Sequence, residues 1–240
     1  MKDVLKRITT IVIVTAISLS LAVSAAHASE GKNALRAGAA RIDITPDKPV
    51  KMAGYGARTA LSEGVHDPLS ARVVAFENNG KRLVMVSADL IGFSGGTAEH
   101  FREILLNEFK LQPSELFLSG IHTHGGPILT IDKENGHANN LEYTKNLGPK
   151  LIEVIRKALD KMEPVNVGAG VGHCPVGVNR RELVFDGTGN STIRLGRNPY
   201  GPTDKEVLVM KLARPDGSPC AALFDYATHA PGMGGKNLIV

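Results

Sequence analysis

The stretch from residue 83 to residue 120 constrains the fold most, because it alternates between strand and helix patterns. Residues 83–87 form an apolar strand pattern that runs into a glycine-rich turn. Residues 97–109 then repeat apolar side chains at helical spacing, and residues 115–120 return to a strand pattern. A strand, a helix and a strand in this order predict a crossover between two parallel strands of one sheet.

The rest of the chain adds hairpins and a second helix. Asn78-Asn79-Gly80 and Pro215-Asp216-Gly217 each separate two strand patterns, so each is expected to turn a β-hairpin. An apolar stripe runs through residues 147–162 at helical spacing. Residues 178–202 are polar and rich in turn residues, and we expect a long loop there. These elements predict an α/β fold, with a mixed sheet built from strand–helix–strand crossovers and β-hairpins.

Two strands that lie far apart in the sequence both end in histidine. One runs into His122 and His124, and the last strand of the chain runs into His229. Ligands of open α/β sheets bind beyond the carboxyl ends of the strands, and a catalytic zinc ion commonly has three protein ligands. We therefore expect a metal site at the strand ends, with Asp89, Asp225 or a residue beyond position 240 as a further ligand. The alternative is a surface loop with incidental histidines.

The first 28 residues are organised like a secretory signal peptide. Three basic residues precede an uninterrupted run of apolar and small residues, and Ala26-His27-Ala28 provides a small-x-small cleavage site. A retained membrane anchor is the alternative, but the apolar run is short for a membrane span. We expect residues 1–28 to be removed, and the mature chain from residue 29 to be periplasmic or secreted.

Charge content bears on whether the protein binds nucleic acid, and cysteine content on whether it forms a disulfide. The formal net charge of +4 is modest, and no basic run is interleaved with aromatic residues, so nucleic acid is not an expected partner. The two cysteines, Cys174 and Cys220, each lie beside a predicted strand. An exported protein can oxidise them, so a disulfide and a pair of buried free thiols both stay open.

Several short blocks occur in an order that is typical of one enzyme family. From residue 35 to the end of the chain they are GAARIDITPDKPVKMAGYG, GVHDPLSARVVAF, SGIHTHGGP, VNRRE and FDYATHA. This arrangement resembles the N-terminal domain of the neutral/alkaline non-lysosomal ceramidases, and IHTHGGP is its most specific block. The family usually has His-Thr-His-Ser-Gly-Pro, so Gly125 stands where a serine is common.

The resemblance implies a zinc-dependent amide hydrolase that cleaves the N-acyl bond of ceramide-like lipids to a sphingoid base and a fatty acid. It implies that His122 and His229 are zinc ligands. His124 would face the scissile amide and assist proton transfer or oxyanion stabilisation, and Arg180 or Arg181 would stabilise the same oxyanion. The partner would be an N-acyl lipid substrate such as ceramide, met in transient contact with a membrane surface.

The resemblance also implies that residues 29–240 are the amino-terminal part of a larger catalytic domain. The family completes its zinc shell with a glutamate and a tyrosine from a later stretch, so we expect impaired activity from this chain alone. Two other interpretations stay open: a non-catalytic exported binding domain with the same fold, and another His-x-His metallohydrolase. The metallo-β-lactamase type expects an aspartate and a histidine directly after the pair, where this chain has Gly125-Gly126-Pro127.

Overall fold

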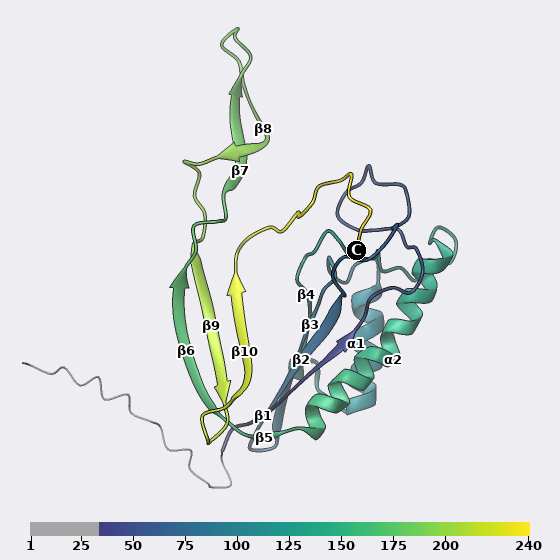
Figure 1. Cartoon of the computed structure of the whole chain (residues 1–240), viewed down its shortest axis with the longest axis vertical. Coiled ribbons are helices and arrows are strands. Elements are labelled where there is room, and N and C mark those ends of the chain that lie inside the picture. The colour runs from purple at the N-terminus through teal and green to yellow at the C-terminus, as the bar shows by residue number, and fades with distance from the viewer. Residues whose placement is uncertain (1–33) are drawn as a thin grey trace, which may run out of the picture.

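The structure is a computed structural model that describes residues 34–240, and it contains two helices, a short 3₁₀ turn and three β-sheets in that part of the chain (Figure 1). The predicted signal peptide, residues 1–28, lies outside the described residues. No helix between residues 34 and 240 is both long and apolar enough to cross a membrane.

A five-stranded mixed sheet forms the centre of the fold, as predicted. Its strand order is β4-β3-β2-β1-β5, and all neighbours are antiparallel except the parallel pair β3 and β4. Helix α1 and the 3₁₀ turn η1 connect this parallel pair, which confirms the predicted crossover. The elements are β1 (Arg36–Asp43), β2 (Ser70–Asn78), β3 (Lys81–Ala88), α1 (Thr97–Phe109), η1 (Pro113–Glu115), β4 (Leu116–Gly120) and β5 (Glu163–Pro164).

The β2–β3 hairpin turns at Asn79-Gly80, as the sequence indicates. Both residues have positive φ, 52° and 75°, which a two-residue type I′ turn requires at its two central positions. The hairpin fixes a register in which alternate side chains of β2 and β3 face the helices. These buried side chains include Val73, Ala75, Val84 and Val86.

The main core lies between one face of this sheet and the two helices. Helix α2 (Ala138–Asp160) lies along β1 and β2 and buries Leu147, Leu151 and Ile155 against them. It begins at residue 138 rather than at 147, because the His137 side chain accepts a hydrogen bond from the Asn139 amide and caps the helix earlier than predicted. Pro149 therefore lies inside the helix instead of near its start.

A second, three-stranded antiparallel sheet extends from the base of the first one (Figure 1). Its strands are β6 (Asn166–His173), β9 (Glu206–Ala213) and β10 (Pro219–Tyr226), in the order β10-β9-β6. Between β6 and β9 the chain forms a separate hairpin of β7 (Asn179–Phe185) and β8 (Ser191–Asn198), which projects away from the rest of the molecule. The prediction of a long loop at residues 178–202 was therefore wrong.

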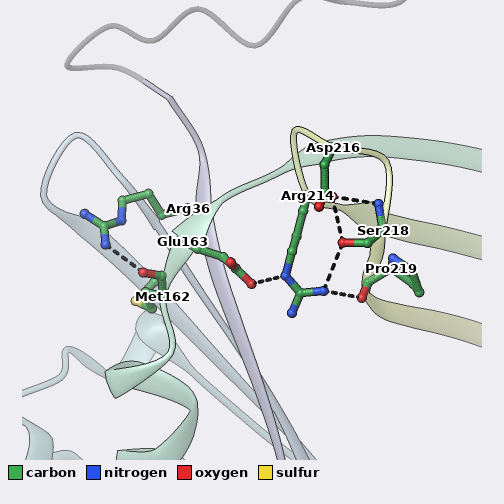
Figure 2. A network of polar contacts seen from close by, with 7 residues as sticks. All are labelled: Arg36, Met162, Glu163, Arg214, Asp216, Ser218 and Pro219. Atoms are coloured by element: carbon green, nitrogen blue, oxygen red, sulfur yellow. Dashed lines mark hydrogen bonds and ion pairs between the residues drawn. The ribbon is translucent and has the colours of Figure 1, made fainter.

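A polar network joins the two sheets at their base (Figure 2). The Arg214 guanidinium donates to the Glu163 carboxylate over 2.7 Å, and so connects the β9–β10 turn to β5. It also donates to the Pro219 carbonyl over 2.6 Å. Beside this network, Ala37, Val165 and Leu212 form a small second core between the sheets. These contacts hold the β9–β10 turn of the second sheet against β5 and β1 of the first sheet.

The two cysteines are free thiols at opposite ends of the second sheet. Cys174 follows β6, where its amide donates to the Lys205 carbonyl just before β9 begins. Cys220 lies in β10 beside the end of β9. Because the length of β9 separates them, the disulfide that the sequence left open does not form.

Candidate functional site: a cluster of three histidines

His122 lies just beyond the carboxyl end of β4. The amides of Ile121 and His122 donate to the carbonyls of Ala88 and Leu90, each over 3.0 Å, so the chain stays beside β3 past the end of the strand. His122 has φ 64°, a left-handed conformation that turns the chain here. Its Nδ1 lies 2.9 Å from the Ile91 carbonyl oxygen. That contact requires a hydrogen on Nδ1 and leaves the Nε2 lone pair free to bind a ligand.

His124 is buried, with 8% of its surface exposed. Its ring packs so closely against Gly54 that a Cβ atom there would lie 2.3 Å from the His124 Cγ. Gly54 also has φ 101°, which residues with side chains rarely adopt. Tyr55 contacts the same ring edge-on, with 4.9 Å between the ring centroids. The loop of residues 51–66 therefore forms one wall of the site.

His229 completes the cluster from a distant part of the chain. Its Nε2 lies 2.9 Å from the His124 Nε2, although the two residues are 105 positions apart. The ring centroid of His122 is 5.2 Å from that of His124 and 5.1 Å from that of His229. The three imidazoles each offer a ligand atom within 4.8 Å of the others. The predicted convergence of His122 and His229 is confirmed, and His124 joins them.

This donor set fits a transition-metal ion. Two ligand nitrogens of a tetrahedral zinc site lie about 3.3 Å apart, given Zn–N bonds of about 2.0–2.1 Å. Imidazole nitrogens suit zinc and its neighbours in the periodic table, whereas calcium and magnesium prefer oxygen. The Nδ1 of His124 is buried and has no hydrogen-bond partner in the described part of the chain.

The surroundings keep two of these imidazoles neutral. Burial is the largest cause that lowers the pKa of His124 below its usual 6.5, followed by the neighbouring His229. Burial also lowers the pKa of His229, followed by the positive charge of Arg180. Neutral imidazole is the form that binds a metal ion, so both side chains are ready to act as ligands at neutral pH.

The structure shows which of the two candidate arginines, Arg180 or Arg181, lies at the site. The Arg180 Nη1 lies 2.8 Å from the Nδ1 of His229, which places the guanidinium at the rim of the cluster. Arg181 is the next residue of β7, just past an irregularity in the β7–β8 register between Asn179 and Arg181. Its backbone amide bonds to Asn179, and its carbonyl accepts from Asn198. Of the predicted pair, Arg180 is the one that reaches the site.

The two aspartates considered as further ligands do not belong to the cluster. The Asp89 carboxylate accepts hydrogen bonds from the Ser70 amide and hydroxyl, over 2.8 and 3.0 Å, and pairs with Arg72 over 2.7 Å. The Asp89 carboxylate thus joins the start of β2 to the end of β3, which is a structural role and not that of a metal ligand. Asp225 is exposed on β10 and is not one of the grouped ligand residues.

Sequence reasoning missed Arg58, which lies behind His124. Arg58 is 8% exposed, and its guanidinium donates to the backbone carbonyl of His124 over 2.7 Å. Within residues 34–240 it forms no ion pair with a carboxylate. A buried positive charge held only by carbonyl groups is uncommon and costly, but no local sequence pattern reveals it.

Comparisons with known proteins agree with this geometry. Residues 35–240 match the family model described as neutral/alkaline non-lysosomal ceramidase, N-terminal. The chain is 26% identical to neutral ceramidase B of Dictyostelium discoideum, over 88% of this chain and 30% of that protein. It is 25% identical to neutral ceramidase 1 of Arabidopsis thaliana, over 82% of this chain and 26% of that protein.

The fold is shared with a solved structure. The neutral ceramidase of Pseudomonas aeruginosa, in its crystal structure, superposes with a TM-score of 0.65 and 19% identity, over 87% of this chain and 34% of that one. The chain thus spans only 26–34% of the length of these relatives. The match over residues 35–240 and the shared fold establish that the chain belongs to the neutral/alkaline non-lysosomal ceramidase family.

Proposed function

We propose that this chain carries part of the active site of a zinc-dependent amide hydrolase that cleaves the N-acyl bond of ceramide-like lipids. The observation that carries the proposal is the meeting of three imidazoles from two distant strand ends, with an arginine at their rim. Family membership supports the substrate class, since the relatives are named as ceramidases. The products are a sphingoid base and a fatty acid.

His122 and His229 are the proposed zinc ligands. The Ile91 carbonyl fixes the tautomer of His122 in which Nε2 is free, as outer-shell carbonyls do for metal-binding histidines. Bound zinc supplies Lewis acidity, which polarises a carbonyl group and lowers the pKa of a coordinated water to about 7. Two imidazoles are an incomplete zinc shell, so residues 1–240 alone should turn over substrate weakly.

His124 and Arg180 are proposed to act on the amide itself. His124 is buried and has a lowered pKa, so it is neutral at pH 7 and can accept a proton and pass it to the leaving amine. Arg180 would donate to the oxygen on which negative charge develops. If the Nε2 of His229 held the metal ion, its Nδ1 would carry the hydrogen and could not accept from Arg180. The guanidinium would then be free to turn to the substrate.

Export is part of the same proposal. The basic, apolar and small-residue order of residues 1–28 supports secretion to the periplasm or the cell exterior. Ceramide-like lipids reside in membranes, so transient contact with a membrane surface would accompany turnover.

Zinc binding by the 240-residue chain tests the metal site. Equilibrium dialysis with elemental analysis should find one zinc ion for each chain. His122→Ala and His229→Ala should each weaken zinc binding by more than the roughly 10–100-fold that loss of an outer-shell partner costs. His173→Ala is the matched control, because His173 is an exposed histidine at the end of β6, outside the cluster. Equal zinc binding in all four proteins would rule out this metal site.

Release of fatty acid from a fluorescent short-chain ceramide tests the reaction. Weak, zinc-dependent hydrolysis should fall about a hundredfold or more in Arg180→Met, the usual effect of removing one oxyanion donor, and stay unchanged in Arg181→Met. Tightly held zinc together with fast turnover would contradict the incomplete zinc shell. Zinc binding without hydrolysis of any N-acyl lipid would contradict the proposed substrate.

A further inference from the structure

The histidine cluster draws its members from the strand ends of two different sheets. His122 and His124 follow β4 of the first sheet, whereas His229 follows β10 of the second. The two sheets are joined at their base, at the opposite end of β10 from His229 (Figure 1). Beyond Tyr226 the chain has no helix or strand to hold His229 in place. Some other contact must therefore bring the segment around His229 to His124.

Arg58 contacts both sides of this junction. Its Nη2 donates to the His124 carbonyl over 2.7 Å and also to the Ala53 carbonyl. Its Nη1 donates to the Asn237 carbonyl over 2.9 Å, in the segment that follows His229. A rigid, forked guanidinium suits such a task, because it can hold several acceptors in one plane.

Tyr55 makes a second connection of the same kind. Its ring lies edge-on against His124, at an interplanar angle of 77°, and its hydroxyl donates to the Pro231 carbonyl, two residues after His229. The Arg58 guanidinium lies 5.2 Å from the centre of the Tyr55 ring, so the two side chains also support each other.

Backbone hydrogen bonds extend the junction beyond these two side chains. The amides of Glu63 and His66 donate to the carbonyls of Leu238 and Val240, each over 2.8 Å. The Val240 amide donates to the Gly64 carbonyl over 3.0 Å. The segment of residues 229–240 is therefore docked along the loop of residues 51–66. Tyr55 and Arg58 each contact both that segment and His124.

We propose that Tyr55 and Arg58 are positioning residues that hold the segment of His229 against His124, and so keep His229 within reach of the metal ion that it would share with His122. Neither side chain belongs to the ligand set, and each acts through the backbone or the ring of His124. The proposal rests on the proposed function in that the cluster binds a metal ion. Its expected consequence is that loss of either residue weakens metal binding without removing a ligand.

Zinc and cobalt(II) titrations of the 240-residue chain test this. Arg58→Met keeps the aliphatic stem but loses the donors, and should weaken binding by about 10–100-fold, the usual effect of an outer-shell partner. Tyr55→Phe keeps the ring contact and loses only the hydroxyl, so it should weaken binding less. Arg58→Lys keeps the charge and should recover part of the loss. Arg36→Met is the matched control, because Arg36 also donates to a backbone carbonyl, that of Met162, far from the site (Figure 2).

A measurement without metal separates this proposal from the proposed function. In ¹³C-histidine-labelled, metal-free protein, the rings of His124 and His229 should give nuclear Overhauser contacts, because their centroids are 4.7 Å apart. These contacts should persist in Arg36→Met and disappear in Arg58→Met. If Arg58→Met does not fold, Tyr55→Phe and Arg58→Lys carry both measurements.

The outcomes are distinct. Contacts and affinities within about twofold of the wild type in the Tyr55 and Arg58 variants would overturn the positioning role. Wild-type protein that binds no metal, yet loses the contacts in Arg58→Met, would contradict the metal site and support the positioning role.

Discussion

At the scale of single residues, the lowered pKa values of His124 and His229 predict how metal binding and stability depend on pH. Because the pKa of the proposed ligand His229 is lowered, protons compete with the metal for this imidazole only below about pH 6.5, the value for an unperturbed histidine. Zinc affinity should therefore stay nearly constant from pH 8 to 7 and fall below pH 6.5. Isothermal titration calorimetry over that range measures it.

The metal-free protein should show the linked change in stability. Below pH 6.5 the unfolded chain takes up protons on these histidines, while the folded chain resists them until the pH falls to the lowered values. The free energy of unfolding should therefore fall as the pH drops through this window. In His124→Gln the fall should be smaller, and an equal fall in both proteins would show that His124 contributes nothing to it.

Some residues of the site could be predicted from the sequence and others could not. His122, His124 and His229 were predictable, because a titratable group just beyond an apolar strand is a local pattern. That these histidines form one cluster was a hypothesis about which strand ends lie close together. Tyr55 and Arg58 could not be found this way, since Arg58 bonds to carbonyls 66 and 179 positions away. Backbone carbonyls occur in every residue and leave no trace in the sequence.

At the scale of elements, Asp89 connects the start of β2 to the end of β3. Asp89→Asn loses the negative charge that pairs with Arg72, and its amide nitrogen replaces either the oxygen that accepts from Arg72 or the oxygen that accepts both Ser70 hydrogen bonds. The carboxylate is buried, so we expect a loss of about 1–3 kcal/mol in the free energy of unfolding, measured with urea.

The control for this prediction is Asp225→Asn, an exposed aspartate near the end of β10. A surface change of this kind usually alters stability by less than about 0.5 kcal/mol. Neither variant should alter zinc affinity, because neither carboxylate belongs to the cluster. Weaker zinc binding in Asp89→Asn, at a pH where the protein is fully folded, would restore Asp89 as a candidate ligand.

Elements whose apolar residues recur at a regular spacing were predicted well, whereas the β7–β8 hairpin and the start of α2 were not. The strands of the central sheet and helix α1 alternate or repeat apolar residues, because one side of each packs on the core. The β7–β8 hairpin exposes side chains on both faces, so its sequence has the polar composition of a loop. The true start of α2 depends on a histidine cap, and histidine is a less common cap than serine or aspartate.

At the scale of the whole molecule, the second sheet presents apolar side chains on both faces. Register places Val171 opposite Leu208, and Phe224 opposite Val209 on the other face. Val171 is 68% exposed and Phe224 is 78% exposed. Apolar residues on both faces of a strand are typical of a sheet that is covered on both sides. Only the base of this sheet is packed, by the small core around Leu212.

This exposure predicts that the 240-residue chain associates with itself. Contiguous apolar patches on a monomer usually remain small, and larger ones bind other surfaces or aggregate. The outer strands β6 and β10 also present unpaired backbone groups, which favour pairing with another chain. Sedimentation velocity should therefore show species larger than the monomer, with a share that grows with protein concentration, and the protein should bind a hydrophobic dye.

Lysine substitutions identify the surface responsible. The double variant Val171→Lys and Phe224→Lys places one charge on each face of the second sheet and should shift the protein towards the monomer. Tyr200→Lys is the control, because Tyr200 is 96% exposed in the turn after β8 and lies outside this sheet. Association that responds equally to both changes would mean that total charge matters and the sheet does not. Histidine spacing in the cluster should be unaffected, because the contacts of Tyr55 and Arg58 lie on the loop of residues 51–66 and the segment after His229.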